Sequence, residues 1–454
     1  MTKLSRTVFV TLTFLLTPCI AWTAASGPKI QQWQSKKGAR VYYVPAPELP
    51  MVDVRLVFDA GSARNGEKPG LSSLTNGMLP EGAGTLDATA IARKFEGLGA
   101  RFSNGALRDM AIVSLRSLSE DKFLRPAVEL LALVLGKPTF PDASLARERN
   151  RTLVALQSQQ DALEDLTDIA FMRAVYPGHP YAEQPLGRED SIKTIQRADL
   201  VAFHKQYYVA KNAVIAIVGA VDRARAESIA EELMAALPEG TAATPLPPVK
   251  SLSEAKVIRV DQASTQTHVM VGQPGMRRDD PDYFPLLVGN HVLGGSGLVS
   301  RLADEIREKR GLSYSQYSAF SPMRLEGPFT MGLQTRNDQA EQALALLNQL
   351  LREFIDKGPS EEELIAAKKN ITGSFPLRIA SNSNIVEYLA VIGFYGLPLD
   401  YLDTYNSRVD AVTVAGIRDS FKRRIKPDAL ITVIAGGGTA PGPAAAPVKP
   451  ETKG

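Results

Sequence analysis

Apolar and polar residues alternate over several short stretches of the chain, and longer stretches with a helical period lie between them. Over residues 52–58, apolar side chains occupy every second position, with Asp53 and Arg55 among the residues between them. A period of two predicts a strand with one buried face. Over residues 86–102 the apolar spacing fits one face of a helix, and Gly99 is suited to end it. Together these patterns predict an α+β fold.

Two later stretches predict further helices. The residues from about Leu145 to Tyr176 predict one long polar helix. In "LVSRLADEIREKRGLSY", Leu298, Leu302 and Ile306 stand at i, i+4 and i+8, so we expect all three to pack inward. Gly311 follows this helix and is suited to a left-handed cap at its end.

The chain contains an internal repeat. "IQRADLVAFHKQYYVAKNAVIAIVGA" and "VTVAGIRDSFKRRIKPDALITVIAGG" both combine a polar-faced helix, a short turn and a Val/Ile strand that ends at glycine. Such a repeat indicates two copies of one α+β unit of roughly 200 residues each. We expect an N-terminal domain over residues 26–237, a Pro/Ala/Thr-rich linker with little core potential over 238–254, and a C-terminal domain over 255–437. The composition of 438–454 predicts a disordered tail.

The charge of the chain is nearly balanced. Its 454 residues include 52 Lys and Arg against 49 Asp and Glu, which leaves a net charge of +3. That balance gives no field strong enough to attract nucleic acid or an anionic membrane surface. We therefore expect no nucleic-acid partner.

The N-terminus predicts export. Residues 1–25 combine a basic start, an apolar run and small residues suited to cleavage, which is typical of a secretory signal peptide. An uncleaved N-terminal anchor is the alternative. No later segment has the apolar length of a membrane span, so we expect no integral span after cleavage. Cys19 is the only cysteine, and the mature chain would have none. We expect a periplasmic or otherwise exported protein.

One buried-looking helix lacks the chemistry that its position suggests. "GLSSLTNGM" (70–78) follows a strand-like run, yet it offers only hydroxyl and amide side chains. The four histidines, His179, His204, His268 and His291, have no partner at i, i+4. We expect each to serve packing or the surface rather than a metal site.

"GLSSLTNGM", "HPYAEQPLG", "GNHVLGGSGLVSRLADEIREKRGLSYSQYS" and "YGLPLDYLDTY", in this order and with the repeat above, resemble the pitrilysin/insulinase family of zinc metallopeptidases. The resemblance is to its short two-domain members and covers nearly the whole mature chain. It implies two homologous domains, each a twisted, mostly antiparallel sheet backed by helices. The two domains would face each other as one half of a clam shell.

The resemblance also implies that the zinc site is lost. Active members carry His-x-x-Glu-His on the helix that matches "GLSSLTNGM", and a glutamate ligand on a later helix. Those positions correspond to Ser73, Asn76, Gly77 and Ala155 here. Neutral hydroxyl and amide oxygens are poor zinc ligands, and an amide cannot take a proton from water. We expect no metal in this chain.

A second feature of the family is retained in the C-terminal half. The seven-residue spacing of Arg307 and Tyr314 matches an arginine/tyrosine pair that, in the family, reaches towards the peptide bound at zinc. The alternative is that Arg307 belongs to a charge network with Glu305, Glu308 and Lys309, and that Tyr314 packs across strands.

A glycine-rich stretch precedes this pair. Gly294, Gly295 and Gly297 resemble a shortened form of the glycine-rich loop found in non-catalytic subunits of mitochondrial processing peptidase. A flexible entry loop and simple helix punctuation both remain open for it.

These features predict a substrate-binding, non-catalytic subunit of a heterodimeric zinc peptidase. A homologous partner would supply zinc, and the ligand would be a peptide or an unfolded protein segment that adds to a sheet edge. The chain would then have no independent enzymatic activity. The alternatives are a purely structural assembly subunit, similar to core proteins of respiratory complexes, and an autonomous peptidase with an unrecognised site.

Overall fold

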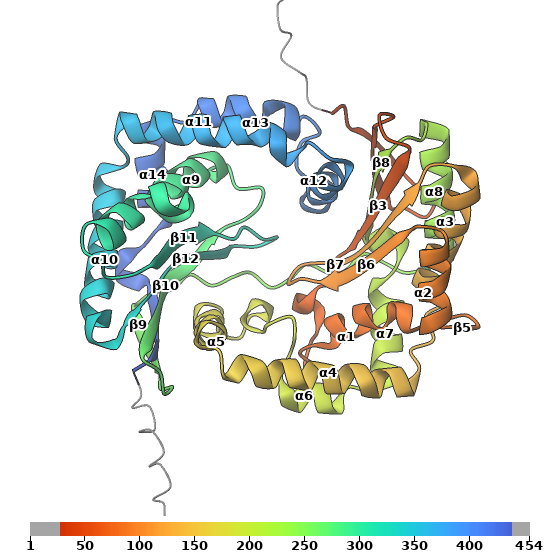
Figure 1. Ribbon diagram of the computed structural model, residues 1–454, viewed down its shortest axis with the longest axis horizontal. Coiled ribbons are helices and arrows are strands. Elements are labelled where there is room, and N and C mark those ends of the chain that lie inside the picture. The colour runs from red at the N-terminus through yellow and green to blue at the C-terminus, as the bar shows by residue number, and fades with distance from the viewer. Residues whose placement is uncertain (1–27, 438–454) are drawn as a thin grey trace, which may run out of the picture.

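The computed structural model describes residues 28–437 of the chain. The predicted signal peptide (1–25) and the predicted tail (438–454) lie outside the described residues. Two β-sheets, each with helices packed on it, form two halves that lie side by side (Figure 1). This arrangement confirms the α+β prediction. Within residues 28–437, no helix is both long enough and apolar enough to cross a bilayer.

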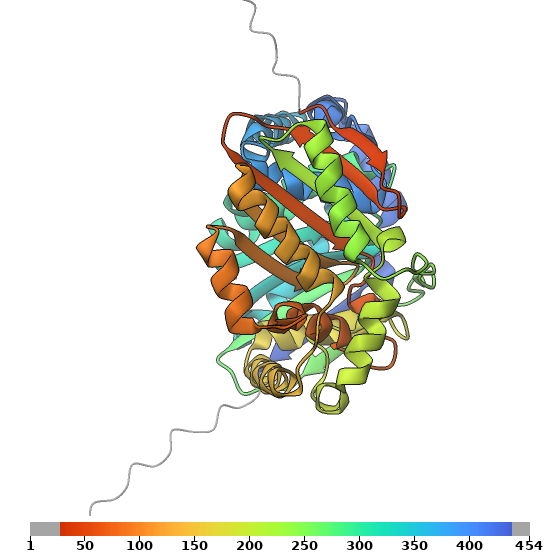
Figure 2. The same cartoon turned by 90° about the vertical axis from the view of Figure 1, so that its right-hand side faces the viewer.

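The N-terminal half is built on a six-stranded sheet with the order β1-β2-β8-β3-β7-β6. β2 and β8 run parallel, and the other neighbouring strands are antiparallel. Helices α2, α3 and α8 cover the outer face of this sheet (Figure 2). The strands are β1 (Gln31–Gln34), β2 (Arg40–Pro45), β3 (Met51–Phe58), β6 (Arg101–Ala106), β7 (Ala111–Leu118) and β8 (Ala213–Gly219).

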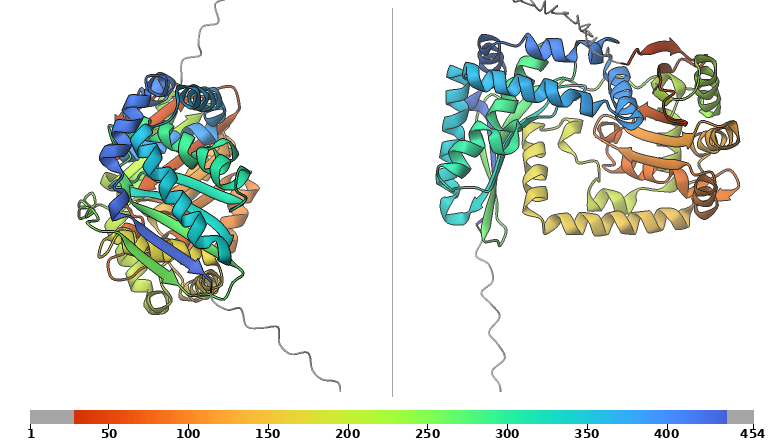
Figure 3. Two further views of the ribbon diagram at one scale, coloured as in Figure 1. Left: turned by 90° about the vertical axis from the view of Figure 1, so that its left-hand side faces the viewer. Right: turned by 45° about the horizontal axis from the view of Figure 1, so that its top comes forward.

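The C-terminal half repeats this topology. Its sheet has the order β9-β13-β10-β12-β11, with β9 and β13 parallel and the other neighbours antiparallel. Helices α10 and α14 cover its outer face (Figure 3). Strand for strand, this matches β2-β8-β3-β7-β6, which confirms the predicted duplication. The strands are β9 (Lys256–Val260), β10 (Gln266–Met276), β11 (Ser315–Phe320), β12 (Gly327–Arg336) and β13 (Ile431–Gly436).

The helices also follow the repeat. In the N-terminal half they are α1 (Leu71–Gly77), α2 (Ala88–Gly97), α3 (Asp121–Gly136), α4 (Asp142–Gln160), α5 (Leu163–Val175), α6 (Glu189–Thr194), α7 (Arg197–Tyr207) and α8 (Arg223–Ala236). In the C-terminal half they are α9 (Tyr283–Asn290), α10 (Ala340–Lys357), α11 (Glu361–Arg378), α12 (Asn382–Tyr395), α13 (Tyr401–Asp410) and α14 (Val414–Arg424). A small two-stranded sheet joins β4 (Gly82–Ala83) and β5 (Leu86–Asp87).

Each half gives one helix to the sheet of the other. α5 packs on β10 and β13, whereas α12 packs on β3 and β8 (Figure 1). The two helices hold equivalent places in the repeat: α5 ends one residue before Tyr176, and α12 ends at Tyr395. The halves therefore interlock instead of meeting at a flat surface.

The exchange of helices corrects the prediction for β3. Because α12 covers its second face, β3 is buried on both sides, and Asp53 is only 6% exposed. Asp53 is paired with Arg116 at 2.8 Å, and Arg55 reaches Glu387 on α12 at 3.1 Å. The polar positions of this strand face a helix that comes from the other end of the chain.

The predicted single helix over Leu145–Tyr176 was also wrong. The structure has two helices, α4 and α5, with a break at Asp161 and Ala162. Ala162 has an extended backbone, with φ −101° and ψ 111°. The break allows α5 to turn away from α4 and reach the C-terminal sheet.

Two equivalent hairpin turns meet where the halves join. Asp109, in the β6–β7 turn, accepts hydrogen bonds from the Tyr395 hydroxyl at 3.1 Å and the Arg324 backbone N–H at 2.7 Å. The Tyr181 hydroxyl also donates to Asp109, at 2.5 Å. In the matching place, the Tyr176 hydroxyl donates to the Glu326 carbonyl in the β11–β12 turn, at 2.9 Å. Each exchanged helix is thus tied to the hairpin of the sheet it covers.

The segment 238–254 forms no helix or strand, as its composition predicts. It is nevertheless attached to the N-terminal half, because His179 Nε2 donates to the Pro247 carbonyl at 2.9 Å. Leu246, Val249 and Leu252 are partly buried against the core. No residue of the segment is buried, so its contribution to the core is limited to these three half-buried side chains.

Candidate functional site

Helix α1 begins at a position that requires glycine. Gly70 has φ 96°, and an added Cβ would lie 2.4 Å from Ile192 Cδ1. Within the helix, the Ser72 hydroxyl donates to the Ala60 carbonyl at 2.5 Å, and the Thr75 hydroxyl donates to the Leu71 carbonyl at 2.8 Å. The hydroxyl groups of this helix therefore satisfy the buried backbone around it.

The degenerate zinc-motif positions lie on α1 and α4. The Ser73 hydroxyl donates to the Pro185 carbonyl at 2.6 Å. Gly77 is exposed, and an added Cβ would meet no heavy atom within 4 Å. Ala155 lies half-buried on α4. Of these three positions only Ser73 carries a side-chain oxygen, and a neutral hydroxyl is a poor ligand for zinc.

Asn76 stands where an active relative would have its catalytic glutamate. It is fully buried, and its Nδ2 donates to the Tyr208 hydroxyl at 3.0 Å and to the Ile112 carbonyl at 3.2 Å. Its backbone carbonyl accepts from Asn104 Nδ2 at 2.5 Å. Burial raises the pKa of Tyr208, so the phenol stays protonated. Asn76 therefore joins α1 to β6, β7 and α7 as a structural residue.

This donor set does not fit zinc. A hydroxyl bound to a carbonyl, a buried amide, a glycine and an alanine offer none of the imidazole, thiolate or carboxylate ligands that zinc requires. Between residues 28 and 437, no three His, Cys, Asp or Glu side chains are grouped to hold a metal ion.

Two of the four histidines, His179 and His204, make structural hydrogen bonds. His179 accepts the Tyr181 backbone N–H at Nδ1, so the proton is on the Nε2 that bonds Pro247. His204 Nε2 lies 2.8 Å from the Leu135 carbonyl. Burial lowers the pKa of both rings and keeps them neutral.

Arg307 and Tyr314 lie together at the surface of the C-terminal half. The Arg307 guanidinium carbon is 4.5 Å from the centroid of the Tyr314 ring. Tyr314 is 81% exposed and immediately precedes β11, while Arg307 Nε is 3.4 Å from a Glu308 carboxylate oxygen. Gly311, between them, has φ 60° and reverses the chain as expected. Tyr314 is thus not a cross-strand packing residue.

The helix before this pair differs from its prediction. Leu302 and Ile306 are buried, but Leu298 is 65% exposed. Leu298 lies in a 3-10 turn over Gly297–Val299, and the backbone of the next residue, Ser300, is extended. Leu298 is therefore not on the same helical face as Ile306, which lies in the π-helical turn at Ala303–Glu308. The expectation that all three residues pack inward was wrong for Leu298.

The glycine-rich stretch is packed at its start. An added Cβ at Gly294 would lie 2.4 Å from the Ser318 backbone nitrogen, and one at Gly295 would lie 2.6 Å from Asn290 Nδ2. Gly297 has φ 64°. These constraints favour a role for all three glycines in ending and restarting the helical segments, not in a flexible loop.

The structure does not bring the two predicted sets of residues together. Ser73, Asn76, Gly77 and Ala155 lie in the N-terminal half. Arg307 and Tyr314 lie next to the start of β11. Figure 1 shows β11 in the half opposite to α1 and α4. A single chain therefore does not complete an active site of the family's kind from these positions.

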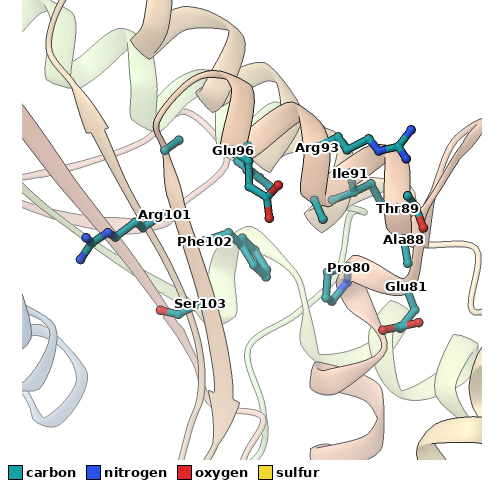
Figure 4. A pocket seen from close by; sticks show the side chains of 13 residues that line it. Pro80, Glu81, Ala88, Thr89, Ile91, Arg93, Glu96, Arg101, Phe102 and Ser103 are labelled. Carbon is teal, nitrogen blue, oxygen red and sulfur yellow. The ribbon is translucent and has the colours of Figure 1, made fainter.

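A groove that the sequence did not predict lies between α2 and the free edge of β6. Its volume is about 940 Å³. The Phe102 ring and the Glu96 carboxylate point into it, whereas Arg101 and Ser103 point to the other side of β6 (Figure 4). The alternation along β6 is visible in the sequence, but its place at a sheet edge is not. The groove is lined by Pro80, Glu81, Ala88, Thr89, Ile91, Ala92, Arg93, Phe95, Glu96, Ala100, Arg101, Phe102 and Ser103.

Two family models match the chain. "Insulinase (Peptidase family M16)" matches residues 40–188, and "Peptidase M16 inactive domain" matches residues 194–371. A solved structure of a peptidase M16 inactive domain from Pseudomonas fluorescens is 43% identical, with a TM-score of 0.88; the match covers 91% of this chain and 100% of that chain.

Curated relatives carry differing names. The non-peptidase homolog YmxG of Helicobacter pylori is 28% identical over 380 residues, 82% of this chain and 86% of that protein. The uncharacterized zinc protease YmxG of Bacillus subtilis is 25% identical over 356 residues, 78% of this chain and 86% of that protein. Because one is named a non-peptidase and the other a protease, the residues present in each chain must decide its chemistry.

Proposed function

Because this chain belongs to the insulinase (peptidase M16) family, we propose that it is the substrate-binding, non-catalytic subunit of a heterodimeric zinc peptidase. The chain is an inactive homologue by its residues: the four metal-motif positions hold Ser, Asn, Gly and Ala. A homologous partner with an intact His-x-x-Glu-His motif would supply zinc and the attacking water. The site of action would be the cell envelope, in keeping with the predicted signal peptide.

The observation that carries this proposal is the contrast between the two sites. Asn76 is fully buried and bonded to the core, whereas Tyr314 is 81% exposed beside Arg307. An exposed aromatic ring stacked with a guanidinium contributes little to folding. A role in binding explains why Tyr314 is presented to solvent beside the half-buried Arg307.

The pair suits a peptide carbonyl. The guanidinium presents several N–H donors, and the phenol presents one O–H donor. Bonds from such donors strengthen as negative charge develops on the carbonyl oxygen during hydrolysis. Arg307 and Tyr314 would therefore orient the scissile segment and stabilise charge, while the zinc-bearing partner breaks the bond.

The sheets offer places where an extended segment can lie. Within residues 28–437, β6 ends one sheet and β11 ends the other, so each has an edge that pairs with no described strand. Hydrogen bonds between the backbone of a sheet edge and that of a peptide can form with many different peptide sequences. This supports unfolded proteins or peptides as the substrate class.

Co-expression tests the proposal. This chain would be produced with a homologous chain of the same genome that carries the intact motif, and cleavage of a labelled unfolded peptide would be measured for each and for the mixture. We expect the two chains to co-purify and the mixture to be at least about tenfold more active than the zinc-bearing chain alone. A mixture no more active than that chain would contradict the proposal. A complex whose activity survives loss of Arg307 and Tyr314 would indicate a purely structural subunit.

A further inference from the structure

We propose that Arg278 and Arg324 form a carboxylate-binding site where the two halves join, and that this site holds the free C-terminal carboxylate of a peptide. The proposal rests on the proposed function for the ligand class, a peptide. It adds a second binding site, at the opposite end of β11 from Arg307 and Tyr314. The length of β11 separates the two sites by about 20 Å.

Two adjacent chain segments carry the arginines. Arg277, just after β10, forms an isolated parallel bridge with Met323 in the β11–β12 turn. The Arg278 backbone N–H donates to the Met323 carbonyl at 2.8 Å. Arg278 and Arg324 are the next residues on these two parallel segments, so their side chains leave the backbone on the same side.

Tyr395, at the end of α12, lies close to both arginines. Its hydroxyl donates to Asp109, which also accepts the Arg324 backbone N–H. Burial and the charge of Asp109 raise the pKa of Tyr395, while the charges of Arg278 and Arg324 act against that rise. Both guanidiniums therefore lie at the same place, beside the end of α12.

The Arg278 guanidinium has no partner of opposite charge. Among residues 28–437 its side chain makes no ion pair and no hydrogen bond, and its Nε is buried. Its guanidinium carbon is 5.1 Å from the centroid of the Tyr283 ring. The nearby carboxylates are engaged elsewhere, Asp279 with Arg277 and Asp280 with Arg424. Buried donors are normally satisfied, so this side chain lacks the acceptors that an anion would supply.

Arg324 is also incompletely paired. Its Nη2 is 3.6 Å from Asp59 Oδ2, but that carboxylate already accepts two hydrogen bonds from Arg64, at 2.7 and 2.8 Å. In the described part of the chain, the buried Nε of Arg324 has no partner. Arg324 therefore keeps donors for a ligand, next to those of Arg278.

The charges around the site favour an anion with a single charge. Three guanidiniums and two carboxylates meet there: Arg64, Arg278, Arg324, Asp59 and Asp109. One carboxylate would neutralise the remaining positive charge, whereas a doubly charged phosphate would leave a negative charge beside Asp109. The planar fork of a guanidinium also matches the two oxygens of a carboxylate.

The aromatic rings favour the end of a peptide over an acidic side chain. The guanidinium carbon of Arg324 is 4.2 Å from the Phe394 ring centroid, and that of Arg278 is 5.1 Å from the Tyr283 ring centroid. These rings offer apolar surface beside the charges. A terminal carboxylate brings the side chain of the last residue to this surface, whereas the carboxylate of Asp or Glu carries no further group. The site should select an apolar last residue.

Peptide binding to the isolated full chain tests this inference. The probe is a hexapeptide, Gly-Ser-Gly-Ser-Ala-Leu, with fluorescein at its N-terminus and a free C-terminus. One matched probe has a C-terminal amide, and another has the amide and Glu in place of Leu. Anisotropy titrations without any zinc-bearing partner should give an affinity at least about tenfold higher for the free acid than for either amide.

Two variants and one control assign the site. Arg278→Gln and Arg324→Gln should each weaken binding of the free acid at least about fivefold and leave the amides unchanged. Arg277→Gln is the control, because Arg277 is exposed, adjacent in sequence and paired with Asp279. It should change no affinity. Arg278→Gln should melt no lower than the wild type, because the residue has no partner to lose.

The outcomes separate this inference from the proposed function. Equal affinity for the free acid and its amide would overturn the site, and so would an equal loss in Arg277→Gln. A Glu-bearing amide that binds as tightly as the free acid would overturn the assignment to a peptide terminus. Absence of binding by the isolated chain would overturn the site even if co-expression yields an active complex. Selective binding that depends on Arg278 would support it even if no heterodimer forms.

Discussion

The Arg307 guanidinium carbon lies 4.5 Å from the centroid of the Tyr314 ring, and the ring is 81% exposed. The turn at Gly311 brings the two side chains together across the end of the helical segment and the start of β11. Their stacking holds both donors in one place at the surface. This contact joins residues that are close in sequence. The length of the turn between them accounts for their seven-residue spacing.

Removing either donor should lower the activity of the proposed complex and leave folding intact. We expect Arg307→Ala and Tyr314→Phe each to reduce the turnover of the complex by about 10- to 100-fold, because a donor to the developing charge is lost. Steady-state kinetics of the complex and thermal melting of the isolated chain would measure this. Arg310→Ala is the matched control, because Arg310 pairs with Glu305 on the same segment.

Asn76 cannot be returned to a carboxylate without cost. Asn76→Asp would place a charge in a fully buried site facing the Ile112 carbonyl, and we expect a loss of about 2–4 kcal/mol in the free energy of unfolding at neutral pH. The buried carboxyl would have a raised pKa, so the loss should shrink as the pH falls towards that value.

Chemical denaturation at two pH values would measure the loss. Gly77→Ala is the control, because an added Cβ there meets open space. An Asn76→Asp variant as stable as the wild type would show that the site accepts charge.

The Asp109 carboxylate should contribute strongly to the joining of the two halves. Asp109→Asn replaces one acceptor oxygen with a donor where Tyr181, Tyr395 and the Arg324 N–H all donate, so we expect a loss of about 2–4 kcal/mol. Tyr395→Phe removes one bond and should cost about 1 kcal/mol. Denaturation of the single and double variants would give their coupling. Additive losses would contradict a shared network.

Stability should decrease on mild acidification. Burial is the main cause that lowers the pKa of His179, His204, His268 and His291 below the ordinary 6.5. Between the folded and unfolded pKa values the unfolded chain holds more protons, so the free energy of unfolding rises with pH there. The contribution is complete above about pH 7 and is lost as the pH falls through 6.5 and below.

Melting temperatures across this range should show the trend. His204→Gln keeps a donor for the Leu135 carbonyl, and it should flatten the pH dependence. An unchanged slope in this variant would remove His204 from the explanation.

Chelation should not affect the isolated chain. The positions that hold zinc in active relatives lack ligands here, so we expect the melting temperature to be the same with and without EDTA. Metal analysis of the tag-free protein should show zinc well below one equivalent. Stoichiometric zinc bound through the chain's own side chains would overturn the assignment as a non-catalytic subunit.

The sequence by itself determined the local elements and the chemistry they carry. The alternation over 52–58, the repeat of helix, turn and Val/Ile strand, and the loss of ligands at Ser73, Asn76 and Gly77 are all properties of short segments. Such patterns reflect burial of one side of a strand or helix and can be read without knowledge of the partner surface. The spacing of Arg307 and Tyr314 belongs to the same class.

Only the tertiary structure decided what covers each surface. The second face of β3 is buried because α12, from the C-terminal half, packs on it. The chain breaks at Ala162 so that α5, from the N-terminal half, can pack on the C-terminal sheet. Leu298 lies off the apolar face because a local turn changes its register. β6 has a free edge because, in the part of the chain that the structure describes, no strand lies beyond it in the sheet. These outcomes depend on contacts between residues far apart in sequence, and the period of a single segment carries no information about them.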